Sequence, residues 1–84
     1  MALSNQALFD QLVSLAESVG ISVRQDTMEG SRGGLYILKG KRHLVINRDL
    51  PIDEKVDLLV ENLSKENLDG VFVLPAVRER LDRG

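Results

Sequence analysis

The sequence RGGLYILKGKRHLVIN, residues 32–47, predicts a β-hairpin around which the rest of the chain is arranged. Two apolar runs, residues 35–38 and 44–46, are separated by a short basic stretch that contains Gly40. Glycine readily adopts the positive φ that a tight hairpin turn requires. We therefore expect two antiparallel strands joined at this glycine.

The register of the hairpin depends on which residues occupy the two central turn positions. A turn centred on Gly40-Lys41 would place Ile37 opposite Leu44, whereas a turn centred on Lys39-Gly40 would place Ile37 opposite Arg42. Pairs of apolar side chains stabilise an antiparallel ribbon. We therefore expect the turn at Gly40-Lys41.

Both faces of this ribbon are mainly apolar, so both need cover. We expect helices over residues 4–19 and 52–66 to cover one face. The second face could be covered by a last helix, through Val77 and Leu81, or by a second copy of the chain in a two-fold dimer. The residues expected on this second face, and hence at a dimer contact, are Tyr36, Leu38, His43 and Val45.

The remaining segments predict an α+β fold. Ser4 is a favourable N-cap for the first helix, residues 21–24 alternate as in a short edge strand, and Pro75 opens the last helix, which runs to about residue 83. Val71-Phe72-Val73 predicts a further short strand. The expected order is α-β-β-β-α-β-α, with helices packed on a small, mainly antiparallel sheet of three or four strands.

Composition limits the class of protein. The 84 residues predict a single domain over residues 1–84, with 43% hydrophobic and 29% charged residues, as in soluble globular proteins. The absence of cysteine excludes disulfides and thiolate metal sites and favours a reducing cytoplasm. The first twenty residues contain no Lys or Arg, and no apolar run is long enough to span a membrane. We expect a cytoplasmic protein without a membrane partner.

The positive charge is concentrated around the hairpin. Residues 21–48 contain six basic residues and two acidic ones, whereas residues 49–84 contain nine acidic residues and five basic ones. Such an island can bind an anion or a partner, or it can be a solvated rim that protects a sheet edge from aggregation. The six basic residues are Arg24, Arg32, Lys39, Lys41, Arg42 and Arg48.

Catalytic chemistry is not predicted. His43 is the only histidine, and zinc requires three or four ligands. Three glycines in residues 30–34 precede a predicted strand, whereas phosphate-binding loops lead into a helix. We expect no enzyme activity, no cofactor and no bound metal.

The hairpin, the short loop containing Pro51 and the helix after it resemble the N-terminal core of ImmA/IrrE-type zinc metallopeptidases. The resemblance spans residues 32–64. In that family the helix carries His-Glu-x-x-His, in which the histidines bind zinc and the glutamate activates water. The matching window here is Val60-Glu61-Asn62-Leu63-Ser64, which retains the glutamate but neither histidine. The resemblance implies a relative that kept the scaffold and lost the metal.

Three classes of function follow from these observations. We expect a non-catalytic interaction or regulatory module, with a homodimer or an unidentified protein as the partner. The alternative is a nucleic-acid-binding protein that uses the basic hairpin, which is disfavoured because Tyr36 is the only aromatic residue there. A hydrolase related to the zinc metallopeptidases is the least favoured class.

Overall fold

The computed structural model describes residues 3–83, and over these residues it contains three helices and a three-stranded sheet. The helices are α1 (Asn5–Ser18), α2 (Ile52–Leu63) and α3 (Pro75–Arg83). The strands are β1 (Ile21–Asp26), β2 (Gly33–Leu38) and β3 (Lys41–Asn47). The predicted α+β class is confirmed.

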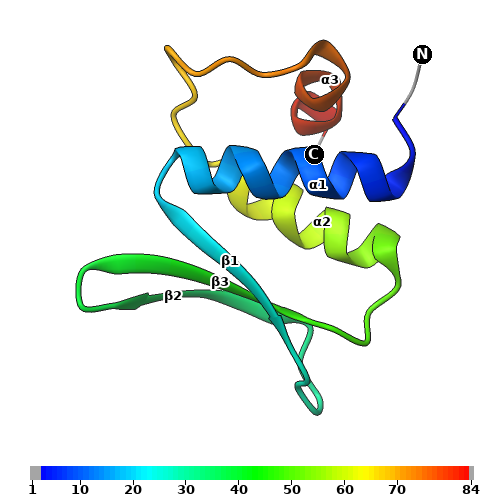
Figure 1. Ribbon diagram of the computed structural model, residues 1–84, viewed down its shortest axis with the longest axis vertical. Helices are drawn as coiled ribbons and strands as arrows, with labels where there is room; N and C mark the ends of the chain where they lie inside the picture. Colours follow the sequence, from blue (N-terminus) through cyan, green and yellow to red (C-terminus); the bar gives the residue numbers. More distant parts are fainter. Residues whose placement is uncertain (1–2, 84) are drawn as a thin grey trace.

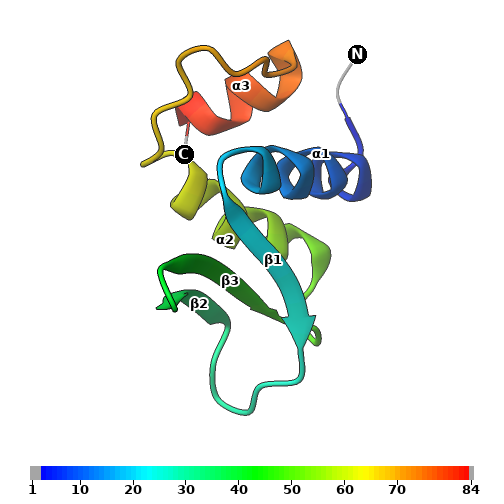
Figure 2. The ribbon, with the colours of Figure 1, turned by 60° about the vertical axis from the view of Figure 1, so that its left-hand side comes forward.

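All three helices lie on one side of the sheet (Figure 1). α1 packs on β1 and on α2, and α2 also contacts β2 and β3. α3 packs on α1 and α2, on the side away from the sheet, and contacts none of the strands (Figures 1 and 2). The last helix therefore does not cover the second face of the sheet. The largest fully buried side chains in the core are Leu12, Ile21, Leu44, Ile46, Leu59, Leu63, Val60 and Val77.

The sheet is mixed rather than mainly antiparallel, so that part of the expectation is wrong. The strand order is β1-β3-β2, with β1 parallel to β3 and β2 antiparallel to β3. β3 thus lies between two strands that follow one another in the chain. Residues 27–32 carry the chain across the end of β3, from one edge of the sheet to the other.

Asn47, the last residue of β3, anchors this crossing segment. Its side-chain amide donates hydrogen bonds to the carbonyl oxygens of Met28 and Ser31, each at 2.8 Å. Its backbone N–H donates to the carbonyl of Arg32 at 3.0 Å. One side chain therefore fixes the position of a loop that contains few apolar residues.

The predicted fourth strand over residues 71–73 does not form. Residues 71–74 form an irregular connection to α3, and Phe72, Val73 and Leu74 lie beside α1. α1 separates this segment from the sheet (Figure 1). Val73 and Leu74 pack against the buried core, whereas Phe72 is 81% exposed, and no strand edge is within reach of the segment.

The hairpin turn is also in the register that we rejected. Lys39 and Gly40 are the central residues, with φ of +51° and +78°, so Ile37 lies opposite Arg42 and Leu35 lies opposite Leu44. Two successive positive φ values define a type I′ turn, whose twist matches that of the strands. The twist of the turn outweighs the better apolar pairing. The change is two residues on one strand, so it leaves each side chain on the expected face.

The helix starts agree with the sequence, and one helix end differs. The Ser4 hydroxyl accepts a hydrogen bond from the Ala7 N–H at 3.1 Å and caps α1, as predicted. α2 begins directly after Pro51 and ends at Leu63, three residues earlier than expected, where the chain becomes polar. Within residues 3–83, no helix is long and apolar enough to cross a membrane.

Candidate interaction surface

β2 exposes a continuous run of apolar side chains. The exposed fractions are 42% for Leu35, 36% for Tyr36, 70% for Ile37 and 54% for Leu38. These are four of the five large apolar residues that are exposed in the described chain. Single exposed apolar residues are ordinary on proteins, whereas a contiguous group marks a contact surface.

The position of β2 explains this exposure. β2 is an edge strand, and the side chains of Leu35 and Ile37 share the helix-covered face with Leu44 and Ile46. Leu44 and Ile46 on the central strand are fully buried, but the helices leave most of Ile37 uncovered. We expected both β2 residues to lie under the helices. The sequence signal for their exposure was the Lys39-Gly40 turn, because its register moves Ile37 beyond the apolar part of β3.

The backbone of β2 adds unpaired polar groups to this surface. Hydrogen-bonded and non-hydrogen-bonded pairs alternate along an antiparallel ladder. The Asn47 N–H bonds to the Arg32 carbonyl, so the next pair, Gly33 with Ile46, is a non-hydrogen-bonded one. The N–H and C=O groups of Gly33, Leu35 and Ile37 therefore point away from β3. The Gly33 N–H donates to the Ser31 hydroxyl at 3.1 Å, so the groups open to pairing are the Gly33 C=O and both groups of Leu35 and Ile37. No strand within residues 3–83 pairs with this outer edge.

The two edges of the sheet differ in their chemistry. On β1 the residues that face away from the helices are Ser22, Arg24 and Asp26, all polar and exposed. Charged side chains on an edge strand discourage pairing with another chain. β2 has no charged residue and no proline between Gly33 and Leu38. Only β2 has the composition of an edge that is open to pairing.

Two neighbouring glycines at the start of β2 have different local roles. Gly33 has φ of +113°, and a Cβ atom there would lie 2.1 Å from the Val45 carbonyl oxygen, so the backbone requires glycine. Gly34 has no such φ, and a Cβ there would have nothing within 4 Å. The fold of one chain therefore explains Gly33 but gives no reason for Gly34.

The four residues expected at a dimer contact share the face of the sheet that no helix covers. The Tyr36 and His43 rings stack, with centroids 5.1 Å apart and planes at 15°. Leu38 is exposed, but Val45 is only 9% exposed even without a helix above it. The apolar area available on this face is therefore mainly that of Leu38 and Tyr36.

Four of the six basic residues are engaged in contacts within the chain. Arg42 pairs with Glu66 at 2.6 Å and also donates to the Val19 carbonyl, and Arg32 pairs with Glu61 at 3.1 Å. The other two contacts are between Arg24 and the Asp26 carboxylate at 3.9 Å, and between Arg48 and the Gln25 carbonyl at 3.1 Å. Lys39 and Lys41 lie in and beside the hairpin turn, and neither forms an ion pair within residues 3–83.

The window that matches the zinc-binding helix lies in α2. Val60 is buried in the core, and Ser64 is exposed at the helix end. The Glu61 carboxylate accepts two hydrogen bonds from one nitrogen of Arg32, at 3.1 and 3.2 Å. No group of three His, Cys, Asp or Glu residues among those described could hold a metal ion.

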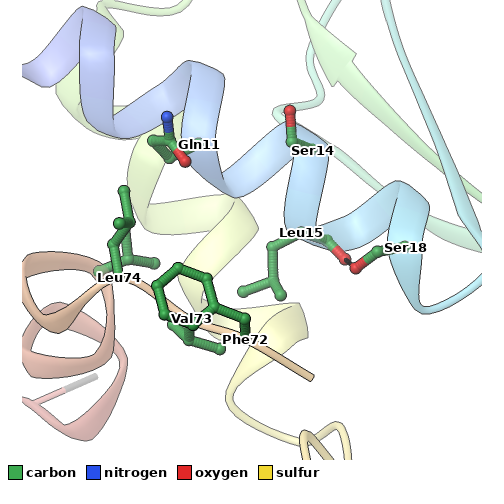
Figure 3. A pocket seen from close by; sticks show the side chains of 8 residues that line it. Gln11, Ser14, Leu15, Ser18, Phe72, Val73 and Leu74 are labelled. Carbon is green, nitrogen blue, oxygen red and sulfur yellow. Dashed lines mark hydrogen bonds between the residues drawn. The ribbon is translucent and has the colours of Figure 1, made fainter. Parts of the chain in front are cut away.

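A second surface feature is a hollow of about 390 Å³ between α1 and residues 72–74 (Figure 3). Its apolar side includes Leu15, Val73 and Leu74, while Gln11 and Ser14 line its polar side. The Ser18 hydroxyl at its rim donates to the Leu15 carbonyl at 2.7 Å. Phe72 beside it is 81% exposed. The hollow is open and contains no charged side chain.

Comparisons of the chain with protein-family models, with curated proteins and with solved structures found no match.

Proposed function

We propose that this protein is a small, non-catalytic interaction module of the cytoplasm that binds another polypeptide through strand β2. The observation that carries this proposal is the run of four exposed apolar side chains, Leu35 to Leu38, on an edge strand with unpaired backbone groups. The cytoplasmic assignment is supported by the absence of cysteine in a small domain.

The mode of binding follows from the chemistry of the edge. An extended segment of another polypeptide can add to a sheet edge, where main-chain hydrogen bonds supply affinity and alternate side chains supply specificity. In β2, the Gly33 C=O and the N–H and C=O groups of Leu35 and Ile37 would supply the hydrogen bonds. The side chains on both faces of the strand would supply the apolar contact.

Nucleic-acid binding is supported less well. Phosphate contacts need free cationic groups, and single-strand binders add aromatic platforms. Four of the six basic side chains are engaged within the chain, and Tyr36 already stacks on His43. The resemblance to zinc metallopeptidases is likewise consistent with a scaffold used for binding rather than for hydrolysis, since Glu61 is paired with Arg32.

Site-specific photo-crosslinking in the native cell tests this proposal. A photoreactive phenylalanine derivative replaces Ile37 in one variant and the exposed Glu79 of α3 in the control. We expect protein adducts, identified by mass spectrometry and reproduced with the purified partner, at position 37 and not at position 79. A position 37 variant that yields no specific protein adduct would refute an interaction through β2.

A further inference from the structure

We infer that the polypeptide bound by β2 is the β2 strand of a second copy of this chain. The two strands pair antiparallel about a two-fold axis at Leu35, so that a single continuous sheet spans both chains. This inference rests on the proposed function and names its partner.

The positions of the unpaired backbone groups favour this register. Residues that point outward must face one another in the new ladder. An axis at Leu35 pairs Leu35 with its own copy and Gly33 with Ile37 on either side. All three outward residues then take part, and the ladder has about four main-chain hydrogen bonds, because the Gly33 N–H of each chain already donates to the Ser31 hydroxyl. An axis at Tyr36 would oppose Gly33 with Lys39, which lies in the turn with φ of +51°.

Side-chain sizes are complementary in the same register. On the helix-covered face, Ile37 lies opposite Gly33 of the second copy. On the open face, Tyr36 lies opposite Gly34 of the second copy. Large side chains packed over glycines on a neighbouring strand compensate for the missing side chain, as in the aromatic rescue of edge glycines. Gly34, which the single chain does not require, thereby acquires a structural role.

The difference between the two edges explains why such an assembly would close at two chains. After β2 has paired with its copy, the remaining edges of the joint sheet, as formed by residues 3–83 of each chain, are the two β1 strands. These carry the polar residues Ser22, Arg24 and Asp26 on the open face. Edges of this kind resist further pairing. A two-fold contact is also the commonest closed arrangement of identical chains.

Edge pairing accounts for the exposed residues better than the stacking of two open sheet faces. Stacking would bury Leu38 and Tyr36, but it would leave Ile37, the most exposed residue of the run, on the opposite side of the sheet. It would also leave the outer backbone groups of β2 unpaired. Edge pairing places the β2 side chains on both faces of the sheet beside side chains of the second copy.

The first measurement is the mass in solution. Sedimentation equilibrium at micromolar concentrations should give twice the chain mass of 9.3 kDa. Ile37→Lys should raise the dimer dissociation constant at least tenfold, with an unchanged circular dichroism spectrum. Phe72→Lys, at an apolar residue outside β2 that is also mostly exposed, is the matched control and should leave the dimer intact. Gly34→Val should fold as a strand and also weaken the dimer, because its side chain occupies the place of Tyr36.

The second measurement tests the register and does not depend on those variants. The chain has no cysteine, so Leu35→Cys introduces a single thiol. In a hydrogen-bonded pair on the axis the two Cα atoms lie about 5.5 Å apart, within the range that a disulfide spans. Mild oxidation should therefore link Leu35→Cys chains into dimers, whereas Ser22→Cys on β1 should stay unlinked.

Several results would overturn the inference. A single-chain mass at all concentrations would do so, as would a dimer that survives Ile37→Lys, or a Leu35→Cys protein that links no faster than Ser22→Cys. A single-chain mass together with adducts to a different protein at position 37 would refute the pairing of two copies while supporting the proposed function. Loss of the position 37 adducts altogether would refute both.

Discussion

Replacing Gly33 by alanine should destabilise the protein far more than the same change at Gly34. The two residues are adjacent in β2, and both changes add one methyl group. At Gly33 the φ of +113° disfavours any side chain, and the added Cβ would lie 2.1 Å from the Val45 carbonyl oxygen. At Gly34 the added Cβ meets nothing within 4 Å. Comparing the two substitutions therefore separates the cost of backbone strain and steric overlap from the effect of replacing a glycine in an unstrained position.

The magnitude follows from these two terms. A non-glycine residue held in an unfavourable backbone conformation costs about 1–3 kcal/mol. Shifting β3 away from the new methyl group would weaken a ladder hydrogen bond worth about 1 kcal/mol. We expect Gly33→Ala to lower the free energy of unfolding by about 3 kcal/mol, out of a total of roughly 4–13 kcal/mol for a domain of this size. The melting temperature would fall by about 12–24 °C. Gly34→Ala should be neutral, or stabilising by about 0.4–1 kcal/mol.

Urea denaturation followed by circular dichroism measures both changes. The substitutions are best made in the Ile37→Lys chain, because self-association would otherwise contribute to the measured stability. A Gly33→Ala protein within about 0.5 kcal/mol of its parent would show that the backbone of β2 relaxes freely, and our reasoning about the start of this strand would be wrong.

Three further predictions concern the crossing loop, the metal and the charge. Asn47→Ala should lower the free energy of unfolding by about 1–3 kcal/mol, because two hydrogen bonds to the crossing loop are lost; equal stability in urea would contradict this. Elemental analysis should find no stoichiometric zinc, and one tightly bound zinc per chain would refute this. Glu61→Ala should change the free energy of unfolding by less than about 1 kcal/mol, because the ion pair of Glu61 with Arg32 is half exposed. Fluorescence anisotropy with a labelled oligonucleotide should detect no complex tighter than roughly 10⁻⁵ M at physiological salt, and micromolar binding would refute this.

The helices could be predicted from the sequence because their signals are local. Ser4 caps α1 as expected, Pro51 and Pro75 stand at the starts of α2 and α3, and the apolar spacing identified the buried faces. Each of these signals acts within one or two turns of helix. Only the last residues of α2 were misplaced, where the chain becomes polar.

The sheet was less predictable because its arrangement depends on contacts between distant residues. Nothing near Ile21 in the sequence indicates that it pairs with Arg42 rather than with β2. The turn register was misjudged because we ranked side-chain pairing above backbone twist, although Lys39-Gly40 forms a favourable turn. The apolar run at residues 71–73 has the composition of a strand but lies outside the sheet, and Val73 lines a hollow beside α1. For the candidate site, the sequence identified the apolar hairpin but not which of its edges is open.

The central position of β3 has a consequence for the cooperativity of unfolding. β1 and β2 do not touch each other in the sheet, so every inter-strand hydrogen bond within residues 3–83 has β3 as one partner. An opening of β3 leaves neither neighbour with a strand to bond to, whereas β1 or β2 can detach alone. The β3 amides that bond to β1 and those that bond to β2 should therefore exchange in separate openings, as the respective neighbour detaches, and both sets should exchange together only when β3 itself opens. The outward amides of Leu35 and Ile37 should exchange as fast as those of a loop whenever β2 is not paired with a second chain.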